Sequence, residues 1–297
     1  MTTGDSTRSR SRLLLLASAA ILFGWSPALA QEVIGRGGKV KIKLEWEKLE
    51  TKNYVISYEK GIPRETIARV GKELEDILVE YRKLFPFKIK GRFQAQILDN
   101  QNTFNQVGGD LRHPGFYSPG NRTLVLLQKE FYSLVPTAYH EAFHQYIDAF
   151  MSHEASIPTW FNEGMATYYE GMQRDEHTRQ KKLNSKKIRV SKIRMVQAKI
   201  RTRQALPVDK LIDATYEEFH DREKEDLYYH QSFALVYYFM QTTKGRGPKM
   251  FMKELQKTKD AEKALEKLVG KKRKGLKKIA AHFKSFTKKV VIPKGRK

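Results

Sequence analysis

The stretch that decides the fold is Thr137-Ala138-Tyr139-His140-Glu141-Ala142-Phe143-His144-Gln145, which contains the pattern HExxH. Residues four apart on a helix lie about one turn apart on the same face, so His140 and His144 can direct their imidazoles to one point. Two neutral ring nitrogens suit a zinc ion, and Glu141 lies on a neighbouring face, where a carboxylate can accept a proton without occupying the metal. The pattern therefore predicts metal-assisted hydrolysis, although by itself it also fits two core or solvated histidines.

The residues around this pattern predict that it lies on a helix of the core. Pro136 is placed for a first helical turn, and apolar side chains then recur at intervals of three and four residues. The residues with this spacing are Tyr139, Phe143, Tyr146, Ile147 and Phe150. A helix with such a buried stripe would hold the two histidines in fixed positions.

A tetrahedral zinc ion at a catalytic site needs a third protein ligand, and the next helical run supplies a candidate. Pro158 opens this run, and Glu163 follows His144 by nineteen positions. The connection is long enough for the second helix to turn back against the first, and Gly164 would let the two backbones approach closely. We therefore predict Glu163 as the third ligand, with a surface position as the alternative. Asp148 is a rival ligand, about 6 Å further along the helix axis than His144.

HExxH followed by Trp160-Phe161-Asn162-Glu163-Gly164-Met165-Ala166 resembles the gluzincin clan of zinc peptidases. The sequence is most similar to an uncharacterised bacterial family of exported, peptidase-MA-like proteins, over about Leu44 to Val290 and most closely at the two motifs. The resemblance implies an α+β fold with a zincin-like (thermolysin-like) catalytic domain, in which a small mixed sheet with an N-terminal helix precedes a mostly helical lobe. Many relatives carry an acidic residue four positions after the third ligand, where it can orient a histidine. Thr167 stands there in this chain, which puts that support in doubt.

Residues 1–30 have the pattern of a secretory signal peptide. Three arginines between Arg8 and Arg12 precede an apolar run from Leu13 to Phe23, and Ala28-Leu29-Ala30 is a small-residue cleavage site. We therefore expect export to the periplasm or the medium after cleavage near Ala30, with an uncleaved N-terminal anchor as the alternative. No later run reaches about eighteen apolar residues, so no transmembrane segment is predicted in the mature chain. The chain contains no cysteine, so its stability must come from core packing.

Residues 31–130 are predicted to form the N-terminal α+β part of the catalytic domain. Apolar residues alternate with polar ones from Val40 to Trp46 and again from Tyr54 to Tyr58, which predicts a strand pair with one buried face. Helical spacing from Ile67 to Leu84 predicts a helix, and two further strands are predicted at 93–98 and 123–127, separated by a loop rich in glycine and proline. The resemblance implies that the edge of strand 123–127 could pair with an extended peptide, with an ordinary buried strand as the alternative.

Residues 131–250 are predicted to form the helical part that holds the metal site. Residues 181–203 contain ten basic residues and no acidic one, and their apolar side chains indicate a basic amphipathic helix. A short helical connection between Leu211 and Phe219 would lead to a helix at 227–240 that is apolar almost all round and therefore buried.

A later helix of gluzincin-like proteins often carries a tyrosine or histidine that hydrogen-bonds the oxyanion of the tetrahedral intermediate. The sequence Tyr229-His230-Gln231-Ser232 resembles the family's version of that segment. The resemblance therefore implies this role for Tyr229, with His230 as the second candidate and plain core packing as the alternative.

The chain is strongly basic, with 56 Lys plus Arg against 33 Asp plus Glu and a formal net charge of +23. Residues 251–297 are predicted to form a basic C-terminal helical segment, whose last part, from Lys271, holds twelve Lys or Arg and no carboxylate. No glycine-rich phosphate loop, paired-cysteine site or RNA-binding aromatic signature accompanies these charges. An anionic envelope polymer or lipid surface is therefore a better predicted partner than a specific nucleic acid.

The combined prediction is an exported zinc metallopeptidase that acts on a peptide or protein substrate. His140, His144 and Glu163 would hold Zn²⁺, Glu141 would be the general base, and Tyr229 would stabilise the oxyanion. Peptide-bond hydrolysis is implied by the resemblance and not by the spacing. Two alternatives are a non-catalytic peptide-binding pseudopeptidase and a basic protein that binds envelope polyanions. The intact Glu141 argues against the first, because a structural zinc ion needs no base.

Overall fold

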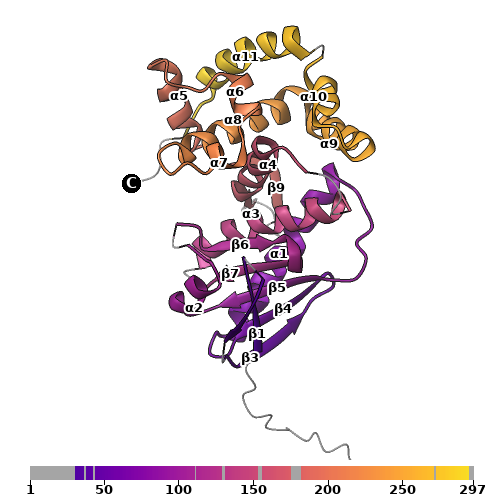
Figure 1. Cartoon of the computed structure of the whole chain (residues 1–297), viewed down its shortest axis with the longest axis vertical. Coiled ribbons are helices and arrows are strands. Elements are labelled where there is room, and N and C mark those ends of the chain that lie inside the picture. Colours follow the sequence, from indigo (N-terminus) through magenta and orange to yellow (C-terminus); the bar gives the residue numbers. More distant parts are fainter. Residues whose placement is uncertain are drawn as a thin grey trace, which may run out of the picture.

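Figure 1 shows the computed structural model of the chain, which describes residues 31–36, 38–42, 44–110, 112–128, 131–152, 156–174, 182–270 and 272–293. The predicted signal peptide lies outside the described residues, and export stays a prediction. The architecture is α+β: a small mixed sheet occupies the lower half of Figure 1, and a mostly helical lobe occupies the upper half. This arrangement confirms the predicted α+β class, with a small mixed sheet and a mostly helical lobe, and the zincin-like character of the domain stays a prediction.

The central sheet has five strands in the order β3-β4-β5-β7-β6. The strands are β3 (Trp46–Glu50), β4 (Tyr54–Glu59), β5 (Phe93–Leu98), β6 (Gly115–Ser118) and β7 (Thr123–Leu127). The three inner strands are parallel to one another, whereas β3 and β6 lie antiparallel at the two edges. A parallel pair needs a crossover connection, and α1 (Arg64–Leu84), which agrees with the predicted helix, joins β4 to β5.

Of the two alternatives for strand 123–127, the structure shows the ordinary buried strand and not the free edge that the resemblance implied. β7 pairs with β5 on one side and with β6 on the other, and all of its side chains are buried. The edge strand is β6, which lies in the segment predicted to be a loop, as do α2 (Gln101–Gln106) and the 3-10 turn η1 (Pro119–Asn121). A strand of four residues between glycine and proline is too short to produce a clear alternation in the sequence.

The predicted strand pair near the N-terminus is right for β4 and partly wrong for its partner. Residues 38–42 belong to a separate hairpin, in which β2 (Gly38–Ile42) pairs with β1 (Gln31–Gly35).

The prediction of a basic amphipathic helix over residues 181–203 is right for only part of that stretch. Its first part is β9 (Leu183–Ile188), which pairs with β8 (Met172–Arg174), and only its second part is helical, as α5 (Ile193–Arg201). Pairing with β8 outweighs local helical spacing there.

The helix that carries HExxH is α3 (Phe131–Phe150), so Pro136 lies inside the helix and not in its first turn. The helix begins earlier because Leu134, which is 1% exposed, already packs in the core. Two hydroxyl groups fix α3 on α1 and on the segment after it: Tyr81 donates to the Tyr139 carbonyl at 2.5 Å, and Tyr146 donates to the Phe85 carbonyl at 2.5 Å. The metal-site helix therefore has a rigid support.

The helical lobe is built around α8, which is buried almost all round, as predicted. Its helices are α4 (Thr159–Glu170), α5, α6 (Val208–Ile212), α7 (Tyr216–Phe219), α8 (Glu225–Thr243), α9 (Arg246–Thr258), α10 (Ala261–Val269) and α11 (Lys272–Lys289). In Figure 1, α3 and α4 lie between this lobe and the sheet. Within the described parts of the chain, no helix is long and apolar enough to cross a membrane.

Gly164 permits a close helix crossing, but with a different partner from the one predicted. A Cβ atom there would lie 2.7 Å from the Ser232 carbonyl oxygen and 2.7 Å from Val236 Cγ2, both on α8. The close approach is therefore between α4 and α8, not between α4 and α3. It brings α8 near the residues that α4 directs toward α3.

The two basic stretches of the lobe meet. The Gln197 side chain of α5 donates to the Thr287 carbonyl of α11 at 3.0 Å and to the Val290 carbonyl at 2.8 Å. The two basic elements are therefore neighbours in the lobe. An anionic partner for them stays a prediction.

Candidate metal centre

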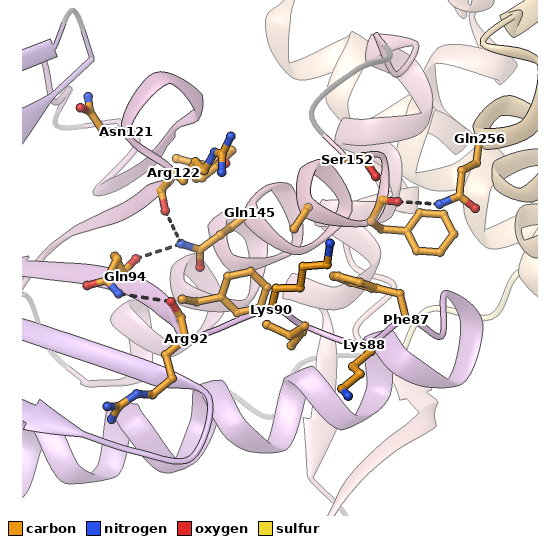
Figure 2. A pocket seen from close by; sticks show the side chains of 15 residues that line it. Phe87, Lys88, Lys90, Arg92, Gln94, Asn121, Arg122, Gln145, Ser152 and Gln256 are labelled. Atoms are coloured by element: carbon orange, nitrogen blue, oxygen red, sulfur yellow. Dashed lines mark hydrogen bonds between the residues drawn. The ribbon is translucent and has the colours of Figure 1, made fainter.

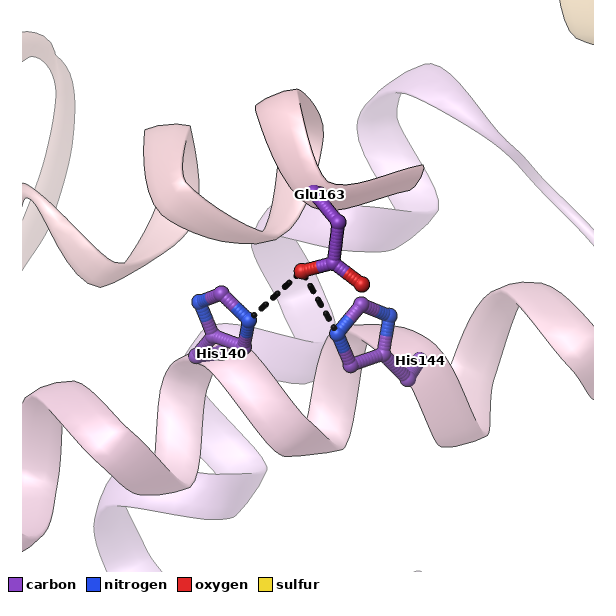
Figure 3. A group of neighbouring side chains, drawn as sticks. All are labelled: His140, His144 and Glu163. Carbon is purple, nitrogen blue, oxygen red and sulfur yellow. Dashed lines mark hydrogen bonds and ion pairs between the residues drawn. The ribbon is translucent and has the colours of Figure 1, made fainter. Parts of the chain in front are cut away.

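The helices α3 and α4 bring His140, His144 and Glu163 together (Figure 3). Glu163 Oε2 lies 3.2 Å from His140 Nε2 and 3.5 Å from His144 Nε2. The candidate ligand atoms of all three residues lie within 4.8 Å of one another, and Glu163 is 9% exposed. The structure thus gathers the three predicted metal ligands into a cluster that could hold a metal ion.

The other ring nitrogens of both histidines have partners of their own. His144 Nδ1 lies 3.0 Å from the amide oxygen of Asn162, and His140 Nδ1 lies 3.4 Å from Glu170 Oε2. Because these oxygens accept hydrogen bonds, they fix the proton on each Nδ1 and leave each Nε2 free to bind a metal. Hydrogen bonds of this kind orient metal-binding histidines and increase their basicity.

The distances in the cluster fit a small tetrahedral ion. Metal bonds of about 2.0 to 2.1 Å would place neighbouring ligand atoms about 3.3 Å apart. The two separations from Glu163 Oε2, 3.2 and 3.5 Å, lie on either side of that value. The rival ligand Asp148 is not in this cluster, and it accepts a hydrogen bond from the Tyr117 hydroxyl at 2.6 Å.

Without a metal, protons neutralise the cluster. Burial alone would lower the pKa of His140, but its hydrogen bonds to Glu163 and Glu170 and the charge of Glu141 outweigh burial and raise the pKa to about 10. The pKa of His144 is also raised, since Glu163 outweighs the effect of burial. Burial would raise the pKa of Glu163, yet the two histidines hold it well below its usual value. The surroundings therefore favour positive charge at the position between the three side chains.

Glu141 lies beside the cluster but outside it. Its Oε2 accepts a hydrogen bond from the backbone N–H of Tyr117 at 3.1 Å. In the antiparallel pair of β6 and β7, the Leu127 N–H donates to the Pro114 carbonyl. Every second residue of β6, counted from Pro114, therefore bonds to β7. Tyr117 is not one of these residues, so its N–H points away from β7. The carboxylate of Glu141 is thus held at the outer edge of β6.

Gly115 allows β6 to approach α3 so closely. A Cβ atom at this position would lie 2.7 Å from Thr137 Cγ2 and 3.2 Å from Glu141 Cγ. Because contacts below 3 Å are not tolerated, any other residue would force the strand away from the helix. The glycine therefore keeps the strand edge next to the predicted base.

A cavity of about 220 Å³ opens beside the cluster. His140 and Glu141 line it from α3, and Tyr229 and His230 line it from α8. The Tyr229 ring centroid lies 6.4 Å from that of His140. Burial and then the charges of Glu163 and Glu141 raise the pKa of Tyr229, so its hydroxyl stays protonated at neutral pH.

His230 also lines this cavity. Its Nδ1 is buried and has no hydrogen-bond partner among the described residues. Burial, and then the charge of Lys192, lower the pKa of His230. Tyr229 is the better placed of the two candidates, because its ring centroid lies 6.4 Å from that of His140.

Three residues of the site escaped the sequence analysis: Asn162, Glu170 and Lys192. The Lys192 ammonium donates to both oxygens of Glu170 at 2.8 Å. Burial would raise the pKa of Glu170, but His140 and Lys192 lower it to about 2. Glu170 thus supplies the histidine support that Thr167 cannot. It follows Glu163 by two helical turns on the same face, which is the signal that could have revealed it.

We expect the substitution Glu170→Ala to weaken metal binding by about 10- to 100-fold, because His140 loses the acceptor that orients its ring. Competition with a chelating dye measures the affinity, and circular dichroism checks the fold. Glu217→Ala, on the exposed face of α7, is the matched control and should bind metal like the parent. Equal affinities for the parent and Glu170→Ala would contradict the assigned support.

We also expect metal binding to strengthen as the pH rises, because the ion must displace protons from the cluster. With its pKa raised to about 10, His140 is protonated at neutral pH in the metal-free protein. Each displaced proton makes the apparent affinity rise by about tenfold per pH unit below that pKa. Isothermal titration calorimetry in buffers with different ionisation enthalpies should show release of at least one proton per ion. Release of none would refute the protonated cluster.

Comparisons with known proteins leave the activity of this site open. A family model described as a protein of unknown function (DUF1570) matches residues 134–262, a segment that includes α3, α4 and α8. A search of curated proteins gives no match. Among solved structures, yeast LTA4 hydrolase in complex with bestatin is similar, with a TM-score of 0.49 and 11% sequence identity. The similarity covers 85% of this chain and 40% of that chain.

Proposed function

We propose that this chain is a zinc-dependent metallopeptidase with a zincin-like catalytic domain of the gluzincin type. The observation that carries the proposal is the convergence of His140, His144 and Glu163, with Glu141 beside them but outside the ligand set. A purely structural site would need the ligands but not the adjacent free carboxylate. The motifs HExxH and WFNEG, which resemble those of gluzincins, support the same class.

Zinc is the metal that this donor set suits best. Two imidazole nitrogens and one carboxylate oxygen form the three-ligand set of many hydrolytic zinc sites, which keep a fourth position for water. When bound, zinc acts as a Lewis acid, lowering the pKa of water to about 7 and polarising a carbonyl group. The hydrogen bonds of Asn162 and Glu170 to the two imidazoles would keep both rings directed at the ion.

Glu141 would move the proton. Its carboxylate lies on the side of the cluster that faces the edge of β6, within reach of a water that attacks a carbonyl group there. Glu141 would accept the proton of that water and then donate it to the departing amine. The hydrogen bond from the Tyr117 N–H would hold the carboxylate in position throughout.

Tyr229 would stabilise the negative charge that develops on the attacked carbonyl oxygen. Its raised pKa keeps the hydroxyl protonated, which an oxyanion donor requires. It lines the cavity from α8. The negative charge would thus be stabilised by a hydrogen-bond donor on a buried helix.

The edge of β6 would bind the peptide backbone. An extended chain can add to a sheet edge through main-chain hydrogen bonds, which do not depend on side-chain identity. The Gly115 backbone and the Tyr117 carbonyl point outward at this edge, next to Glu141, whereas the Tyr117 N–H is already bonded to that carboxylate. A peptide lying there would place one of its carbonyl groups beside the metal cluster, so we propose peptides or proteins as the substrate class.

The substitution Glu141→Gln should retain zinc and lower kcat by at least about a thousandfold, because the site keeps its ligands and loses its base. Elemental analysis of the purified protein gives the zinc content, and a peptide-library screen gives turnover. Glu163→Ala and His144→Ala should lose the metal itself. A folded parent that takes up no zinc, or a Glu141→Gln variant with full activity, would overturn the proposal; zinc without turnover in the parent would favour the pseudopeptidase.

Tyr229→Phe should lower kcat by about 10- to 100-fold with little change in KM, since the hydroxyl acts mainly in the transition state. Tyr228→Phe is the matched control, because Tyr228 is the adjacent tyrosine of α8 and packs against Phe219 with ring centroids 5.2 Å apart. Steady-state kinetics on a single peptide would separate the two constants. If both variants have the same kcat as the parent, Tyr229 has only a packing role.

A further inference from the structure

A second and larger cavity, of about 620 Å³, lies further along α3 from the metal cluster (Figure 2). Gln145, Ala149 and Phe150 of α3 form one wall of it. The segment 87–94, between α1 and β5, forms another wall, and the turn before β7 closes one end. None of the reaction steps proposed above uses this cavity.

The charged side chains that line the cavity are all basic. They are Lys88, Lys90, Arg92 and Arg122, and no carboxylate lines it within the described residues. Arg92 has a partner in Glu50, at 2.6 Å, but no ion pair is found for Lys88 or Lys90 in the part of the chain that the structure describes. Both lysines are exposed. The exposed basic side chains around this cavity would therefore attract an anionic ligand.

Between these charges the wall is apolar. The apolar lining residues are Phe87, Ile89, Phe93, Ala149 and Phe150. Along the segment 87–90 the basic and apolar residues alternate, so the lysines are exposed while Phe87 and Ile89 pack against the core. A matching ligand has negative charge at its rim and apolar groups that it can bury.

Gln145 adds a polar feature to this wall. It is 1% exposed, and its amide nitrogen donates to the carbonyl oxygens of Gln94 and Arg122 at 2.9 Å each (Figure 2). Its amide oxygen is buried and has no hydrogen-bond donor among the described residues. The Gln145 side chain therefore ties β5 to the turn before β7 and holds this wall of the cavity in place.

The cavity lies within reach of a peptide bound at the metal cluster. Tyr117 joins the two sites, because its N–H bonds Glu141 and its side chain lines the cavity. Along the helix axis, Ala149 is about 8 Å from His144. An extended peptide covers that distance with about two or three residues.

We propose that this cavity binds an acidic and partly apolar segment of the peptide substrate, two or three residues from the scissile bond. The inference rests on the proposed peptidase function. Lys88, Lys90 and Arg122 contact the acidic side chains, and the aromatic wall contacts the apolar ones. The cavity thus gives the enzyme a preference for acidic substrates that the backbone contacts at β6 cannot provide.

The test measures binding without turnover, in the zinc-loaded full-length Glu141→Gln protein. Three fluorescent peptides of equal length carry glutamate, glutamine or lysine at the same positions, with phenylalanine between them, and fluorescence anisotropy gives their affinities. We expect the glutamate peptide to bind about tenfold more tightly than the glutamine peptide and the lysine peptide to bind weakest. Lys88→Glu with Lys90→Glu should remove this preference. Ala149→Phe, which fills the cavity, should weaken the glutamate and glutamine peptides alike.

Lys277→Glu with Lys278→Glu, on the exposed face of α11, is the matched control, because it changes the net charge equally far from the cavity. An equal loss of preference in both double variants would show bulk attraction and overturn the proposal. Competition by anionic phosphatidylglycerol vesicles, with no preference among the peptides, would also overturn it and would indicate a lipid site. If the parent cleaves no peptide but the preference is lost only in Lys88→Glu with Lys90→Glu, the binding site stands and the peptidase function fails. If the parent cleaves all three peptides equally and the charge reversal changes nothing, the peptidase function stands and the proposed binding site fails.

Discussion

The site depends on charge balance at the contact between α3 and α4. Glu163 and Glu170 are turned toward two histidines in a space from which most water is excluded, and burying carboxylates without compensation is costly. Without a metal, protons on the imidazoles offset the charge, which is why the pKa of His140 is raised to about 10. Lys192 supplies a further positive charge at the outer side of Glu170. A divalent cation would replace the protons and leave the surrounding hydrogen bonds unchanged.

This arrangement requires that both helices be held rigidly, and they are held from opposite sides. The sheet and α1 support α3 through the Tyr81 hydrogen bond to its backbone. On the same side, Tyr139 donates to Glu73, which also accepts from Arg174 of β8. α8 supports α4 through the close crossing at Gly164. The cleft therefore forms where two independently supported helices meet, and its ligand distances follow from packing in both halves of the molecule.

The elements that sequence could predict are those whose signal is local and periodic. The helices α1 and α8, the strand β7 and the clustering of the three candidate ligands could be predicted, because each rests on spacing along one segment or on a short motif. β6 could not be recognised, since four residues between Pro114 and Pro119 carry no clear alternation. β9 was misassigned because its partner β8 decides its conformation. Asn162 and Lys192 belong to the site only through contacts with residues of other helices, so no sequence spacing predicts their roles. Glu170 could have been predicted from the sequence, because it shares a helical face with Glu163.

In the proposed peptidase, the residues that carry out the reaction and the residues that select the substrate would line two different cavities. The cavity beside the metal cluster is small, about 220 Å³, and carries charges of both signs, so it offers little room to distinguish side chains. In the proposed peptidase, the backbone contacts at β6 would be indifferent to sequence. Discrimination would then have to arise further along the bound peptide, where side chains of the substrate meet side chains of the protein. The larger cavity along α3 has one sign of charge and an apolar wall, which are the properties that selection requires. Because Tyr117 contributes its backbone to the first site and its side chain to the second, a substrate that fills the larger cavity would also be aligned on the edge of β6.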